Sequence, residues 1–179
     1  SDGAHTHTSA AAEVSACQLM ASVAGHLGSV PDLERFLREL LAMFAPPAGW
    51  GPAAGSSSVT VTPLPPSRKL TLQEMTTAVS RTSPGFLVPA LTRKVITACL
   101  GNEAGTRPAE SEVYDFSRKM DITKDSAIQL AEYVAHMAPL MALHLKCKND
   151  LQPTRALREG TQLLAQTMEQ QVHTLHHTP

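Results

Sequence analysis

Eight histidines are the side chains of this sequence best suited to chemistry near neutral pH. His173, His176 and His177 have the spacing i, i+3 and i+4, which places three imidazoles on one face of a helix. Such a group could hold a divalent metal ion. However, the three residues stand in a last helical turn beside Pro179, and no carboxylate is near in sequence to orient them. We therefore expect adventitious nickel or zinc binding here rather than a physiological metal site.

Two further histidines, His136 and His144, lie within one broad face of a long predicted helix. Glu132 precedes His136 by one turn, so these two side chains could form an acid–base pair. Pairs of this kind are far more often ordinary ion pairs or hydrogen bonds on a helix surface. A metal-binding or enzymatic helical domain that uses His136, His144 or the C-terminal histidines is therefore the alternative hypothesis for function.

The sequence contains no phosphate-binding loop, GxGxxG, HExxH, EF-hand loop or GxSxG motif. Cys17, Cys99 and Cys147 are odd in number and widely spaced, which excludes a disulfide framework and a CxxC centre. Each cysteine lies among apolar residues, so we expect a small buried hydrophobe. The acidic residues fall mostly on predicted solvent faces or at helix starts. We expect no catalytic residue, no cofactor and no small-molecule substrate.

The composition narrows the possible partners. The chain of 179 residues has a formal net charge of -1, which argues against binding to nucleic-acid phosphates. Only 4% of its residues are aromatic, which argues against base stacking. Several basic residues gather around one turn, and we expect them to be cations at helix C-termini rather than a nucleic-acid patch. These residues are Lys146, Lys148, Arg155 and Arg158, with Arg118, Lys119 and Lys124.

No run of about 18 apolar residues is present, so no membrane-spanning helix is expected. The first residues lack the pattern of a signal peptide, and the sequence does not begin with Met. We expect a segment of a larger intracellular protein, cytoplasmic or nuclear.

Apolar residues recur every three or four positions, which predicts an all-α fold, a bundle of about seven helices with no convincing sheet. Residues 10–45 are predicted to form a helical hairpin, and 70–179 a five-helix bundle. Between them, 46–69 are rich in Pro, Gly and Ser and predict a linker or long loop. Within it, we expect Trp50 to be an anchor and Val59–Thr62 to be extended chain.

Local signals set the helix ends in the second part. Thr71 and Glu74 fit a capping box. Pro89 should kink its helix or set its start, and Pro139 should bend the longest helix. The helices after the capping box are predicted at Phe86–Leu100, Glu110–Met120, Thr123–Cys147 and Thr154–His177.

The most regular amphipathic helix lies in the second half of the hairpin, with apolar side chains that recur at helical spacing opposite a charged face. Helix-in-groove contacts use anchors at this spacing. Low charge density and seven methionines also favour adaptable apolar surfaces. We therefore expect a non-enzymatic protein–protein interaction or scaffold domain, which binds another protein or itself through this face, although the face could equally bury in its own bundle. The expected anchors are Leu33, Phe36, Leu37, Leu40, Leu41 and Phe44.

Overall fold

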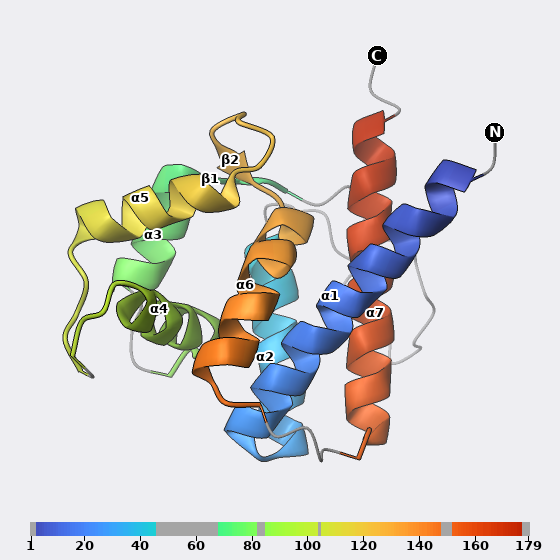
Figure 1. Ribbon diagram of the computed structural model, residues 1–179, viewed down its shortest axis with the longest axis horizontal. Helices are drawn as coiled ribbons and strands as arrows, with labels where there is room; N and C mark the ends of the chain where they lie inside the picture. The colour runs from blue at the N-terminus through green and yellow to red at the C-terminus, as the bar shows by residue number, and fades with distance from the viewer. Residues whose placement is uncertain (1–2, 46–67, 82–84, 104, 148–151, 177–179) are drawn as a thin grey trace, which may run out of the picture.

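The computed structural model describes residues 3–45, 68–81, 85–103, 105–147 and 152–176. These residues form seven helices and one short antiparallel pair of strands, which confirms the all-α prediction (Figure 1). None of the helices described is both long enough and apolar enough to cross a membrane. The elements are α1 (Gly3–Leu27), α2 (Val30–Met43), β1 (Leu70–Thr71), α3 (Leu72–Arg81), α4 (Leu87–Cys99), α5 (Glu110–Met120), β2 (Ala127–Ile128), α6 (Leu130–His144) and α7 (Arg155–His176).

The N-terminal hairpin does not stand apart from the remaining helices. Helix α1 packs against α6 and α7, and α2 packs against α4 and α7 (Figure 1). The α1 side chains that point inward are Ala16, Leu19, Met20 and Val23, at the i, i+3, i+4, i+7 spacing of a single helical face. They belong to one hydrophobic core that continues through all seven helices.

The helix starts follow from local hydrogen bonding. The Ser29 hydroxyl accepts the amide of Asp32 at the start of α2. The predicted capping box is confirmed, because Thr71 Oγ1 accepts the Glu74 amide at 3.1 Å and Glu74 Oε2 accepts the Thr71 amide at 2.9 Å. Pro89 lies in the first turn of α4, where its missing N–H costs no helical bond. It therefore sets the start of the helix rather than a kink.

Several expectations need correction. The longest predicted helix does not begin at Thr123 but at Leu130, because the preceding residues form a loop and then strand β2. β2 pairs with β1, although no sheet was predicted. Cys17 and Cys99 are exposed rather than buried, since each lies on the solvent side of its helix, and Cys147 is half-buried.

The expected roles of Trp50 and Val59–Thr62 concern residues outside the part of the chain that the structure describes.

Gly160 allows α7 to approach the hairpin closely. A Cβ atom at this position would lie 2.8 Å from Met20 Cε of α1 and 3.4 Å from Leu37 Cδ2 of α2. The absent side chain therefore makes room for the residues of two other helices at one junction.

Glu39 lies on the charged face of the amphipathic sequence pattern, but it links α2 to the start of α4. Phe86 precedes α4 and has no side-chain oxygen with which to cap it. Glu39 Oε2 instead accepts the amides of Leu87 at 2.6 Å and Val88 at 3.0 Å. A carboxylate at a helix N-terminus satisfies orphan amides and complements the helix dipole. Glu39 is thus a cap supplied by another helix.

We expect Glu39→Ala to lower the free energy of unfolding by about 1 to 2 kcal/mol, because two amides of α4 lose a charged acceptor. Urea unfolding followed by circular dichroism measures the change. Glu34→Ala is the matched control, since Glu34 is exposed on the same helix and has no such contact. Equal stability of the two variants would show that the amides are satisfied without Glu39.

Candidate functional site

An acidic loop joins α5 to α6. It runs from Asp121 to Glu132, so that its last three residues form the first turn of α6, and it carries acids at its first, fifth and twelfth positions. Lys124 and Ser126, at its fourth and sixth positions, have φ values of 61° and 65° in the left-handed region. Two helices around a twelve-residue loop, with acids at these positions and a sharp turn at the sixth, are the layout of an EF-hand.

This loop departs from the EF-hand sequence motif at two positions. The EF-hand pattern requires Asp or Asn at the third position and Gly at the sixth, where this chain has Thr123 and Ser126. The strict motif is absent from the sequence, as stated above. The acids at the first, fifth and twelfth positions and the left-handed residue at the sixth are nevertheless present. The two residues after the sixth position, Ala127 and Ile128, form β2 and pair with Thr71 and Leu70 of β1.

The buried carboxylates of the loop hold its backbone in place. Asp121 Oδ1 accepts the Asp125 amide at 3.2 Å, and Asp121 Oδ2 accepts the Ser126 amide at 2.9 Å. Glu132 Oε1 and Oε2 each accept an amide at 2.9 Å, from Thr123 and Gln129. These bonds stabilise two left-handed residues without glycine and cap the start of α6.

The remaining acid of the loop, Asp125, contacts a cation that lies next to the opposite strand. Lys69, just before β1, places Nζ 2.5 Å from Asp125 Oδ2. Asp125 Oδ1 accepts the amide of Ala127 at 3.1 Å. The Lys69 ammonium, and to a lesser degree that amide, hold the pKa of Asp125 below its ordinary value, against the effect of burial.

The donor set of this loop does not fit a calcium ion. The Lys69 ammonium contacts the Asp125 oxygen that a calcium loop offers to its ion at the fifth position. The other oxygens of the three acids each accept a backbone amide. The third position offers a hydroxyl where calcium loops have a carboxylate or amide. Within the described residues, no three Asp, Glu, His or Cys side chains are grouped as metal ligands would be.

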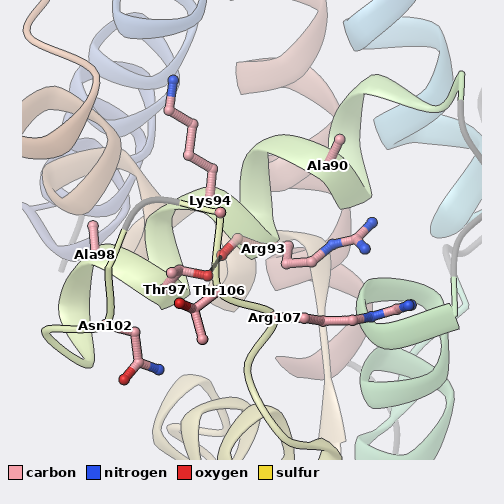
Figure 2. A pocket seen from close by; sticks show the side chains of 9 residues that line it. Ala90, Arg93, Lys94, Thr97, Ala98, Asn102, Thr106 and Arg107 are labelled. Atoms are coloured by element: carbon pink, nitrogen blue, oxygen red, sulfur yellow. Dashed lines mark hydrogen bonds between the residues drawn. The ribbon is translucent and has the colours of Figure 1, made fainter.

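A pocket of about 660 Å³ lies between α4 and the loop that follows it. Its floor is largely small or apolar, and basic side chains stand around it. Figure 2 shows the side chains of Arg93 and Arg107 extending in one direction and that of Lys94 extending away from them. The lining residues are Ala90, Arg93, Lys94, Thr97, Ala98, Asn102, Gly105, Thr106 and Arg107.

The charge around the pocket is one-sided. The lining includes three basic side chains and no acidic one. Among the ion pairs of the described residues, none involves Arg93, Lys94 or Arg107. Glu110 is within electrostatic reach of Arg107, but its carboxylate bonds to Arg81 Nε at 2.8 Å. The pocket is therefore suited to an anion with an apolar body, because guanidinium groups bind carboxylates or phosphates bidentately.

The structure gives His136 and His144 different partners. His136 is half-buried against the Phe116 ring, edge to face at a centroid distance of 5.5 Å, and burial, with help from Lys119, lowers its pKa. His144 Nε2 instead lies 3.4 Å from Cys99 Sγ. The side chains of His176 and His177 lie outside the described part of the chain, so the metal-binding hypothesis for the C-terminal histidines stays a prediction.

The Cys99–His144 contact has the composition of a nucleophile and a base but not their tuning. Burial raises the pKa of the Cys99 thiol, which opposes formation of the reactive thiolate. Cys99 is also the last residue of α4, where the helix dipole disfavours a negative charge. The contact therefore gives no support to nucleophilic catalysis.

The six predicted anchors of α2 lie in the core of their own chain. Leu33, Phe36, Leu37, Leu40 and Phe44 are buried, and Leu41 is half-buried against them. Partner binding through this face would require α2 to leave the bundle. The alternative stated with the prediction, burial within the same bundle, is what the structure shows.

The basic residues expected at helix C-termini are found there only in part, because Arg155 is the first residue of α7. Arg118 and Lys119 stand in the last turn of α5, as the helix dipole favours. Arg155 Nε bonds to Glu159 at 2.6 Å, so part of this charge is neutralised locally. Lys148 lies outside the described residues.

Comparison with known proteins gives no relative from which a function could be carried over. No family model, no curated protein and no solved structure matches this chain.

Proposed function

We propose that this chain is a non-enzymatic protein-interaction domain that receives an acidic segment of a partner protein in the α4 pocket. The observation that carries the proposal is the one-sided charge of that pocket, with three basic lining residues and no acidic one. The rest of the bundle acts as the scaffold that holds α4 and its loop in place. An intracellular setting belongs to this proposal.

The chemistry of the occupant follows from the lining. Arg93 and Arg107 offer planar donors that suit carboxylates, and they extend in the same direction (Figure 2). Ala90 and Ala98 of α4 add apolar contact area to the lining. A short peptide with clustered Asp and Glu and one or two Leu side chains satisfies both features. Because the whole chain is nearly neutral, this local charge, not a general attraction, would select the segment.

The core position of the α2 anchors supports the pocket rather than the α2 face as the binding surface. The enzymatic or metal-binding alternative has less support, because His136 and His144 contact different residues and the thiol beside His144 is not activated.

The test is a titration of the isotope-labelled chain with an acetylated peptide of Asp and Glu that contains two leucines, followed by amide chemical shifts. We expect the shifts to map to α4 and residues 100–107. Arg93→Glu with Arg107→Glu should weaken binding at least tenfold, because two charge-assisted contacts become repulsive.

The matched control is Arg38→Glu with Arg118→Glu, which changes the net charge equally at two exposed sites away from the pocket. It should bind the peptide as the unmodified chain does. Equal weakening by both double variants, or shifts that fall outside the pocket, would contradict a specific acidic-peptide site. Absence of binding would reject the proposal outright.

A further inference from the structure

We infer that the Lys69 ammonium takes the electrostatic part that a bound cation has in an EF-hand, so that strands β1 and β2 stay together without a metal ion. The inference starts from the disagreement between the layout of the acidic loop and its donor set. The layout is that of a calcium loop, but its oxygens are already engaged by the chain's own donors.

The place of Lys69 in the fold supports this role. It comes directly before β1, which pairs with β2 of the acidic loop, and it lies 56 residues from Asp125 in sequence. Its Nζ therefore reaches across the strand pair to an oxygen that the fifth position of a calcium loop gives to the ion. The ammonium connects the residue before β1 to the acidic loop, and it neutralises one of the three acids of that loop.

Neighbouring contacts reinforce the same junction. The Arg68 guanidinium bonds to the Glu74 carboxylate, which caps α3 directly after β1. The amide of Leu72 reaches the Ser126 carbonyl at 3.4 Å, and Leu70 pairs with Ile128. Both strand residues Leu70 and Ile128 are buried, so apolar packing lies directly beneath the charged contact.

This arrangement makes α5 and α6 a fixed pair rather than a calcium-operated one. Sensor EF-hands change the angle between their helices when calcium organises the loop. Here Asp121 and Glu132 organise the loop through four amides without an ion. The angle between α5 and α6 should therefore be indifferent to calcium.

Thermal unfolding of the whole chain tests the inference. The chain is melted in calcium chloride, in magnesium chloride and in EDTA with sodium chloride, all at matched ionic strength. We expect the same Tm in the three solutions. A Tm that is higher in calcium than in magnesium, or calcium-dependent changes in the amide spectrum of the acidic loop, would overturn the inference.

The role of Lys69 is tested separately at low salt. Lys69→Gln should lower the Tm by about 2 °C, because a partly exposed ion pair across the strands is lost. The difference should shrink as sodium chloride is added, and Lys69→Arg should restore the Tm. Lys94→Gln makes the same charge change at an exposed position of α4, and this variant should have the Tm of the unmodified chain. A Lys69→Gln variant that melts as the unmodified chain at low salt would reject the role of the ammonium.

Discussion

Replacing Leu40 with alanine is expected to lower the free energy of unfolding by about 2 to 5 kcal/mol. Leu40 is completely buried at the point where α2 meets the rest of the core. The substitution removes apolar area from the core and leaves a cavity that the surrounding helices can close only in part. Chemical denaturation measures the change. The two variants can be compared if their m-values are equal, because an unchanged m-value indicates that the two-state transition is preserved.

Leu143→Ala is the control for this experiment, since it deletes the same atoms from a side chain that is 70% exposed. It should change stability by no more than about 0.5 kcal/mol. A small effect at Leu40 would mean that α2 is only loosely attached, and it would restore the α2 face as a possible partner surface. A large effect assigns that face to the core in solution as well.

Alkaline pH is expected to destabilise the chain through Tyr133. This side chain is fully buried, and burial raises its pKa from the ordinary value of 10.0 to about 12, with the Thr92 hydroxyl bond acting in the opposite direction. Ionisation therefore occurs first in the unfolded chain. The stability linked to this group is complete below pH 10 and is lost as the pH rises to about 12. The loss amounts to about 2 to 3 kcal/mol.

Comparison with Tyr133→Phe isolates this loss from the ionisation of other groups. The Thr92 hydroxyl donates to the Val88 carbonyl and lies 2.7 Å from the Tyr133 hydroxyl, so phenylalanine removes one hydrogen bond but leaves Thr92 with a partner. Denaturation curves across the alkaline range should be flatter for this variant. Tyr114→Phe, at an exposed tyrosine, should keep the original slope. Parallel curves for Tyr133→Phe and the unmodified chain would contradict the assignment.

The helices could be predicted well where periodicity and capping agree. Glu110–Met120 is predicted with the bounds that α5 has, and the Thr71 capping box starts a helix as expected. The predicted start of α6 at Thr123 is wrong, because apolar residues continue before Leu130 through Ile128 and Ala127 at spacings that also fit a helix. Amide hydrogen bonds that the Asp121 and Glu132 carboxylates accept stabilise a loop there instead, and the partner strand lies 56 or more residues away in sequence.

The candidate sites were harder to predict, because tertiary contacts create them. The basic pocket joins a helix face to the loop after it, and neither Arg93 nor Arg107 belongs to a motif. Glu39 is an ordinary surface acid in the sequence and becomes a cap only when α4 is placed beside α2. The α2 anchors show the converse difficulty. An amphipathic face in sequence does not distinguish a partner outside the chain from one inside it.

The junction around Gly160 has a consequence for how this sequence can change over time. Met20, Leu37 and Gly160 come from three helices and share one small space. A side chain at position 160 would require the flexible end of Met20 to move, so the effects of substitutions at these three positions on stability will not add. Related sequences should therefore vary at these three positions as a set, with total side-chain volume conserved although no single residue is.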